Sequence, residues 1–321
     1  AVVPSCIFGF QKGTSLQNKV FMSDLSKSFS NSRGLSFNNN KLLDYAELIK
    51  FPDNTIPINF EGQKFVRDLT LKIPKKLGDY CDEVNSGVTT GNLNVFMVTD
   101  KIIEEYNLEK SFIKPTLQGR DLNKYAITNN YKYVIYSDNN FKKDKAKNIY
   151  NYLLRHYDEL NKRSEVKQGI KKWFKLGRAR SSNLLSPPKL ICRETGDKIK
   201  CTVDGDGYYV LNTIICIQLN IKDIEFHYFI SGILNSKLMD FIFKQISQET
   251  GRTFAKVRPI NLRKLPVPNY SNVTNTNLSD LVNQILTAKK ANPQADTTAL
   301  ESEIDQLVYE LYGLTEEEIA I

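Results

Sequence analysis

The segments KSFIKPTLQGRDLNKY (110–125) and SEVKQGIKKWFKLGRAR (164–180) lie within the most basic part of this chain. Residues 110–200 hold 22 Lys and Arg against 8 Asp and Glu, a local net charge of +14. The whole chain of 321 residues has a net charge of only +8, so the rest is net acidic. Aromatic and Asn side chains are interleaved with these cations. This combination is typical of nucleic-acid surfaces, because cations neutralise phosphates and planar groups read or stack on bases. A solvated face of a Lys-rich protein is the alternative.

Short apolar runs alternate along the chain with segments of helical periodicity. Strands are predicted where β-branched and aromatic residues are dense, at 95–98, 131–136, 189–192 and 208–219. Helices are predicted where apolar residues recur at spacings of three and four, at 148–166 and 226–243. Asp204-Gly205-Asp206-Gly207 is predicted to be the turn of a hairpin within 196–207. The predicted fold class is α+β.

We expect three parts. Residues 1–75 form the end of one unit with a linker, 76–270 form a mixed α/β domain, and 271–321 form an antiparallel, amphipathic helical pair. Residues 276–321 carry 2 Lys against 9 Asp and Glu, a net charge of −7. Because acidic residues repel DNA, this pair is expected to lie away from the basic face. The chain begins without Met, which suggests a fragment of a longer protein.

Several classes of protein do not fit this composition. Five cysteines without a CxxC motif, and only two histidines, argue against a zinc site or a disulfide scaffold and favour a reducing cytoplasm. The sequence has no apolar run of 18 residues, so no membrane helix is expected. We therefore predict a cytoplasmic protein without a metal site.

The sequence does not predict a catalytic site. Ser186-Pro187-Pro188-Lys189 resembles the Asn/Asp-Pro-Pro-aromatic loop of adenine methyltransferases, but Lys189 cannot stack on a flipped base as the aromatic residue would. A Gly-rich turn for S-adenosylmethionine is also missing. Glu165-Val166-Lys167 fits the Glu-x-Lys pattern of metal-dependent nucleases, but it falls in a predicted helix. We predict no catalytic, metal-binding or cofactor-binding residues in this chain.

A series of short motifs resembles one protein family. Ala1 to Phe8 is similar to the late core strand of the catalytic domain in TaqI-type adenine-specific DNA methyltransferases. Further motifs follow in the order found in the C-terminal target-recognition (specificity) domain of these enzymes and of type IIG restriction–modification enzymes: Gly87 to Asn92, Lys114-Pro115, Gly119 to Leu122 with Tyr125, Lys171 to Leu176, Pro188 to Ile191, Gly232 to Lys237, Ile260 to Pro268, and Leu300 to Thr315. The motifs are individually common, but their order over about two hundred residues is specific.

The resemblance implies an α/β target-recognition domain that faces the major groove of double-stranded DNA, followed by the helical pair. Residues 1–75 would then be the remnant of the catalytic domain with a linker. The implied partners are DNA and the catalytic methyltransferase domain of the same parent chain, whose cofactor would be S-adenosylmethionine. The DNA contacts implied by motif position lie in three loops and one further polar segment: Thr89, Thr90 and Asn92; Gln118, Arg120 and Lys124; Lys171, Lys172, Trp173, Arg178 and Arg180; Lys256 and Arg258.

Alternatives remain open at this point for single residues and for the whole chain. Trp173 is the only Trp and is equally explained by packing, Arg120 by an ion pair with Asp121, and Thr89-Thr90 by a plain turn. For the chain, the alternatives are a protein-interaction module that docks a partner on the acidic helical pair, and a metal-dependent nuclease built on Glu165 and Lys167. Steep salt dependence of duplex binding would favour DNA recognition over both.

Overall fold

The computed structural model describes residues 19–22, 41–44, 60–128, 132–247, 255–270 and 274–320. The chain divides into two compact units, Ala1–Lys72 and Ile73–Ile321. In the first unit, β1 (Lys19–Met22) pairs antiparallel with β2 (Lys41–Asp44), and α2 (Phe60–Lys72) follows. The predicted catalytic-core strand at 1–8 lies outside the described residues. The assignment of 1–75 to a catalytic remnant stays a prediction.

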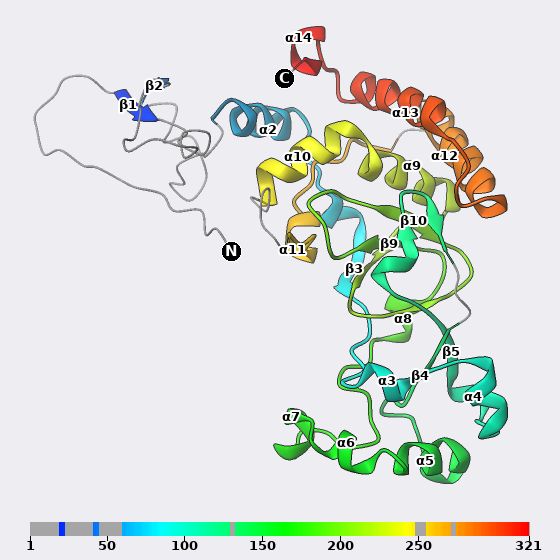
Figure 1. The fold of residues 1–321 in the computed structure, drawn as a ribbon. Coiled ribbons are helices and arrows are strands. Elements are labelled where there is room, and N and C mark those ends of the chain that lie inside the picture. The colour runs from blue at the N-terminus through cyan, green and yellow to red at the C-terminus, as the bar shows by residue number, and fades with distance from the viewer. Residues whose placement is uncertain are drawn as a thin grey trace, which may run out of the picture. The chain divides into compact units, whose positions relative to one another are not determined.

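The second unit is built on a four-stranded antiparallel sheet (Figure 1). Its strands, in the spatial order β10-β9-β12-β3, are β3 (Cys81–Ser86), β9 (Lys189–Arg193), β10 (Cys201–Asp204) and β12 (Ile214–Leu219). Every residue of β12 is buried, and alternate side chains of a strand point to opposite faces, so both faces must be covered. Helix α9 (Ile224–Asn235) packs against β9 and β10, and α8 (Ser182–Leu185) packs against β3 and β12.

A second, smaller sheet has the order β11-β5-β8-β4. Its strands are β4 (Met97–Val98), β5 (Ile113–Leu117), β8 (Tyr133–Ile135) and β11 (Tyr209–Val210), with β11 parallel to β5 and the other pairs antiparallel. The predicted strand at 95–98 is therefore only half right. Residues Leu93–Phe96 form a helical turn, α3, because Asn92 Oδ1 accepts a hydrogen bond from Val95 N at 3.2 Å and caps it.

The predicted hairpin turn at Asp204-Gly205-Asp206-Gly207 is wrong. Strand β10 pairs with β9, whereas β11 pairs with β5 of the other sheet, so residues 205–208 carry the chain from one sheet to the other. Asp204 organises this crossing: its carboxylate accepts hydrogen bonds from the backbone N–H groups of residues 206, 207 and 208 at 2.9–3.0 Å. Local Asp and Gly content indicated a turn but could not indicate which strands it joins.

The predicted helix at 148–166 is divided into three: α5 (Lys147–Leu154), α6 (Tyr157–Asn161) and α7 (Ser164–Lys167). The last break falls at Arg163, whose backbone is extended, with φ −60° and ψ 139°. In this conformation the Arg163 side chain is buried in the unit instead of continuing the helix, and its contacts are described below. Tertiary hydrogen bonding thus overrides the local helical periodicity.

The predicted helix at 226–243 also breaks, at Ser236, between α9 and α10 (Lys237–Ser247). Asn235 causes the break by bonding to strand β10: its amide group donates to Cys201 O and accepts from Cys201 N, both at 2.9 Å. Ser236 Oγ donates to Ile233 O and accepts from Met239 N, which closes one helix and opens the next. Asn235-Ser236-Lys237 therefore lies at a bend, as predicted.

The C-terminal helices belong to the same compact unit. They are α12 (Thr274–Ala291), α13 (Thr298–Leu311) and the short α14 (Glu316–Ile319). Helix α12 packs on α9, where Gly232 permits a close approach: a Cβ at this position would lie 3.0 Å from side-chain atoms of Leu278 and Val282. Helix α13 packs on α10 and α12. The predicted boundary between a recognition domain (76–270) and a helical pair (271–321) is functional, and it stays a prediction.

The remaining elements complete an α+β architecture, which confirms the predicted fold class. They are the hairpin β6 (Leu122–Asn123) with β7 (Ala126–Ile127), and helices α4 (Asp100–Glu105) and α11 (Pro259–Leu262). In Figure 1, α5, α6 and α7 lie at one end of the second unit, and α9, α10, α12 and α13 lie at the other. Within the described ranges, none of the helices combines the length and apolar character needed to cross a bilayer.

Candidate nucleic-acid interface

The first loop (residues 87–92) and the third loop (171–180) are joined by their backbones. Thr89 N–H donates to Arg178 O at 3.0 Å, and Arg178 N–H donates to Thr89 O at 2.8 Å. The Arg178 guanidinium also lies 3.4 Å from Thr89 Oγ1, and the Arg178 side chain is exposed. Two segments about ninety residues apart in sequence, both chosen from their motifs, therefore form one site.

The second loop (residues 118–124) joins the first through residues that sequence inspection missed. Gly119 N–H donates to Thr213 Oγ1 at 2.9 Å, and Asn212 N–H donates to Val88 O at 2.8 Å. A Cβ at position 119 would lie 2.8 Å from Thr213 O, so the close approach requires glycine. Asn212 and Thr213 are exposed. Their signal in the sequence is a polar pair that interrupts the apolar run from 208 to 219.

The further polar segment, with Lys256 and Arg258, continues the same backbone connection. Glu194 N–H donates to Thr213 O at 2.9 Å, and Val257 N–H donates to Glu194 O at 2.8 Å. Lys256 is exposed and its Nζ lies 3.7 Å from Glu194 Oε1, while Arg258 is exposed just before α11. One continuous set of hydrogen bonds therefore links the three loops and this segment. We call its exposed residues the junction face: Arg120, Arg178, Asn212, Thr213, Lys256 and Arg258.

Arg120 is the clearest candidate on the junction face for contact with a ligand. It is exposed within the turn Gly119–Asp121, and it makes no hydrogen bond or ion pair to the described part of the chain. The alternative of an ion pair with Asp121 is not observed, because the Asp121 carboxylate instead accepts a hydrogen bond from Gln118 N at 2.7 Å. Gln118 is half-buried beside it.

Other residues proposed for DNA contact have structural partners in the protein. Thr90 is buried, and its carbonyl accepts hydrogen bonds from Arg163 and from Gly177. Asn92 caps α3, and its Nδ2 donates to Glu159 Oε1 at 2.7 Å. The Thr90 carbonyl and the Asn92 side chain thus hold the first loop, and Thr89 is the residue of this loop that bonds to Arg178.

Trp173 and Arg180 are likewise held by the protein. The Trp173 ring is half-buried and lies 5.1–5.4 Å from the ring centroids of Tyr150, Tyr157 and Phe174, so it packs in an aromatic cluster. Arg180 Nε donates to Gly87 O at 3.2 Å. Burial lowers the pKa of Arg180, and the positive charge of Arg178 lowers it further. Two guanidinium groups thus lie close enough to repel each other at the loop junction.

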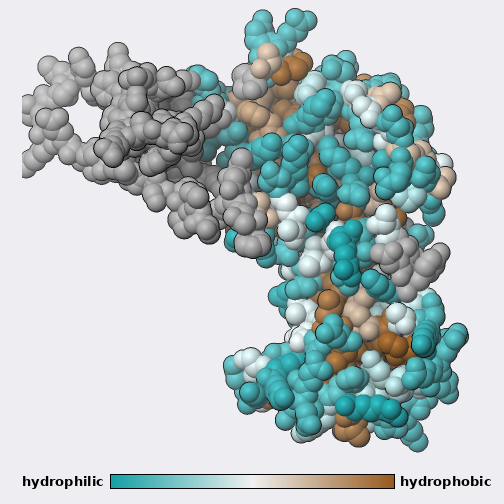
Figure 2. All heavy atoms as spheres, in the orientation of Figure 1, coloured by the Kyte–Doolittle hydropathy of each residue, from teal (hydrophilic) through white to brown (hydrophobic). Residues whose placement is uncertain are grey.

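Three remaining predicted residues take no part in the hydrogen bonds that join the loops. Lys124 points toward the helical end of the unit, where its Nζ donates to Asn235 O at 2.6 Å. Lys172 is exposed and Lys171 half-buried, with Lys171 N–H donating to Glu165 O at 3.0 Å. Figure 2 shows a mainly hydrophilic surface over the end of the unit that carries α5, α6 and α7.

In the predicted nuclease triplet, Glu165 and Lys167 lie on α7, and Glu165 pairs with Arg163 at 3.5 Å.

Arg163, which was not predicted, holds the first and third loops together. It is only 8% exposed, and its guanidinium donates to four carbonyls: Leu160 O at 3.1 Å, Thr90 O at 3.1 Å, Trp173 O at 2.7 Å and Lys175 O at 2.9 Å. Burial lowers its pKa, while the nearby Glu165 carboxylate raises it. In the sequence, Arg163 is one of many cationic residues, so only its hydrogen-bond partners in the structure identify its role.

Comparison with known proteins gives a family match and a similarity of fold. Residues 114–267 match the family model of the TaqI-like C-terminal specificity domain, which confirms the resemblance predicted from the motifs. Among 31 matching chains of solved structures is the Type IIL restriction-modification enzyme MmeI, determined in complex with DNA. The TM-score is 0.56 at 13% identity, over 77% of this chain and 35% of that one, so the similarity shows the fold, and this chain spans about a third of that protein. No curated protein matches this chain.

Proposed function

We propose that this chain is the region of an adenine-specific DNA methyltransferase, or of a fused restriction–modification enzyme, that recognises a specific sequence in double-stranded DNA. The observation that supports this most strongly is the junction face. Segments chosen from their motifs meet through one connected set of hydrogen bonds, most of them between backbone groups, and present exposed Arg, Lys and Asn side chains. Arg and Lys side chains can donate hydrogen bonds to base edges in the major groove, and Asn can both donate and accept them.

We assign readout and positioning to different residues of the junction face. Arg120, Arg178 and Asn212 carry planar groups that can bond two base atoms at once, so they are the proposed base readers. Lys256 carries a single ammonium group and is the proposed phosphate contact, which sets register without reading sequence. Asn92 and Trp173 support the loops and are removed from the proposed contact set.

The catalytic methyltransferase domain of a longer parent chain is the proposed partner of this region. S-adenosylmethionine would be bound by that domain and would supply the methyl group. Neither of the two cavities described below fits this cofactor: four lysines line the larger one and would repel the sulfonium cation, and the smaller one, of about 150 Å³, is below the size typical of small-molecule pockets. The residues of this chain therefore take no part in the methyl transfer in our proposal.

The proposed function is tested by duplex binding from a randomised pool at several salt concentrations. We expect log affinity to fall linearly with log salt, because phosphate contacts release counterions, and one short motif to be enriched. Salt-dependent binding without enrichment would contradict sequence recognition by this chain. Absence of duplex binding at low salt would contradict DNA binding altogether.

Replacing Arg120 with Ala should lower the discrimination between the enriched duplex and a scrambled one by about 1–3 kcal/mol, the contribution of one bidentate base contact. The measurement is a pair of binding titrations, one for each duplex. Arg155→Ala is the matched control, since Arg155 is an exposed arginine after α5, outside the junction face. An equal loss on both duplexes would make Arg120 a phosphate contact instead of a reader.

A further inference from the structure

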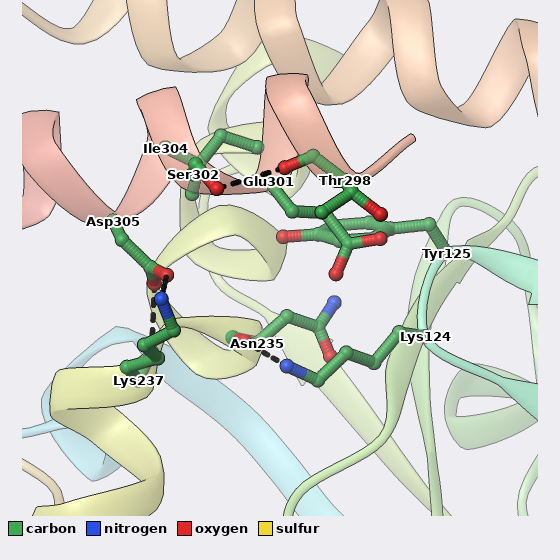
Figure 3. A pocket seen from close by; sticks show the side chains of 9 residues that line it. All are labelled: Lys124, Tyr125, Asn235, Lys237, Thr298, Glu301, Ser302, Ile304 and Asp305. Atoms are coloured by element: carbon green, nitrogen blue, oxygen red, sulfur yellow. Dashed lines mark hydrogen bonds and ion pairs between the residues drawn. The ribbon is translucent and has the colours of Figure 1, made fainter. Parts of the chain in front are cut away.

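Two cavities adjoin each other at the helical end of the second unit. One, of about 150 Å³, lies between the β6–β7 turn, the junction of α9 with α10, and the first part of α13 (Figure 3). The other, of about 280 Å³, lies between the same turn, residues 198–200, and the α12–α13 connection. Lys124 and Glu301 line both, so the two cavities share part of their walls. Both cavities are smaller than the about 300–1,000 Å³ of typical small-molecule pockets.

Lysines dominate the larger cavity. Four of its nine lining residues are lysines, with Glu301 as the one acidic residue among them. We call these lysines the lysine groove: Lys124, Lys198, Lys200 and Lys289. Glu301 does not neutralise them fully, because one carboxylate faces four ammonium groups. The groove therefore favours an anionic ligand.

Two of the four ammonium groups of the groove are oriented by the protein and keep free donors. Lys124 Nζ donates to Asn235 O at 2.6 Å, and Lys289 Nζ donates to Ala295 O at 3.1 Å. An ammonium group has three donors, so each retains two for a ligand. Burial raises the pKa of the nearby Asp240 carboxyl, while the charges of Lys124 and Lys198 lower it, which supports the proximity of these lysines.

The lysine groove is connected to the junction face at two places. Lys124 follows Arg120 by four residues, and Lys198 follows Thr195, the bridge partner of Lys256, by three. Four extended residues span at most about 14 Å. One turn of duplex DNA is about 34 Å long, so the groove lies within the length of one turn from the junction face.

We propose that the lysine groove binds the sugar–phosphate backbone of the duplex beside the bases read by the junction face. This inference rests on the proposed function, and it names a contact surface that the motifs did not indicate. It also revises the expected position of the acidic C-terminal helices. Helix α12 supplies Lys289 to the groove, and α13 supplies Glu301, so the pair forms part of a basic site.

The test compares wild type with the triple variant Lys198→Ala/Lys200→Ala/Lys289→Ala. Each lost phosphate contact lowers the slope of log affinity against log salt by about 0.9, so we expect a decrease of about 2–3. The decrease should be equal on enriched and scrambled duplexes. The matched control is Lys101→Ala/Lys110→Ala/Lys145→Ala, which removes the same charge from exposed lysines elsewhere and should leave the slope almost unchanged.

A second measurement uses the length of the duplex. Wild type should bind an enriched motif with about ten flanking base pairs on each side more tightly than a duplex trimmed at the motif, and the triple variant should lose this preference. The proposed role of the groove would be overturned if the triple variant and its control had equal slopes, or if the triple variant kept the length preference. If wild type did not discriminate between sequences but the slope difference between wild type and the triple variant remained, the proposed function would be overturned and the phosphate contact at the groove would be supported.

Discussion

Replacing Arg163 with Met should lower the free energy of unfolding by about 3–5 kcal/mol, near the upper limit for single substitutions. The Arg163 guanidinium donates to four backbone carbonyls, and the Glu165 carboxylate lies 3.5 Å away. Met fills similar space but donates no hydrogen bond, so buried carbonyls lose their partners. Urea unfolding of the whole chain measures the change.

The control for Arg163 is Arg178→Met. Arg178 is exposed and its side chain makes a single long hydrogen bond, to Thr89 Oγ1 at 3.4 Å, so its replacement should change stability by less than about 0.5 kcal/mol. Arg178→Met should instead weaken DNA binding, because Arg178 belongs to the junction face. Equal stability of the two variants would show that the Arg163 hydrogen bonds do not hold the loops.

The second large effect is expected for Lys189→Met, again about 3–5 kcal/mol of lost stability, because it would leave a buried carboxylate without its counter-ion. Lys189 and Asp204 are both 0% exposed at the side chain, with Nζ 2.6 Å from Oδ2. Lys189 Nζ also donates to Leu185 O at 2.9 Å. The double variant Lys189→Met/Asp204→Asn should recover part of the loss, and urea unfolding of all four proteins gives the coupling energy.

An exposed ion pair of the same residue types provides the comparison. Lys222 Nζ lies 2.9 Å from Asp82 Oδ2, but the two side chains are 52% and 43% exposed. Lys222→Met should therefore cost less than about 1 kcal/mol. A Lys189 variant as mild as the Lys222 variant would mean that Asp204 is neutralised by its backbone donors alone.

Sequence alone was sufficient for the fold class and for the family resemblance, because both depend on patterns spread over many residues. The order of short motifs located the specificity domain, and the strand at 189–192 was found from its composition. The strand predicted over 208–219 is divided into β11 and β12, which belong to different sheets. The positions of the loops relative to one another followed only from the structure. The contribution of Thr213 to the junction, for example, depends on a hydrogen bond to Gly119, far away in the chain.

The individual site residues were harder to predict, because the same residue type serves as ligand contact and as structural support. Lys189 was considered only for its failure to match an aromatic position, yet it is a buried counter-ion. Asn92 and Arg180 have suitable chemistry for DNA, but their hydrogen bonds go to Glu159 and Gly87. Arg120 has no such partner among the described residues. These differences depend on three-dimensional neighbours, and DNA contact by the junction residues stays a prediction.

The junction face is held together mainly by main-chain groups. The bonds between residues 88 and 212, 89 and 178, and 194 and 213 join backbone N–H to backbone carbonyl, and the side chains of Arg120 and Asn212 take no part in them. Substitutions at Arg120 and Asn212 leave those bonds in place, whereas Thr213 also accepts a hydrogen bond from Gly119 N–H through its side chain. The scaffold can therefore tolerate many side-chain combinations at its outer surface, which is the property needed for target sequences to diverge during evolution while the loops keep their positions.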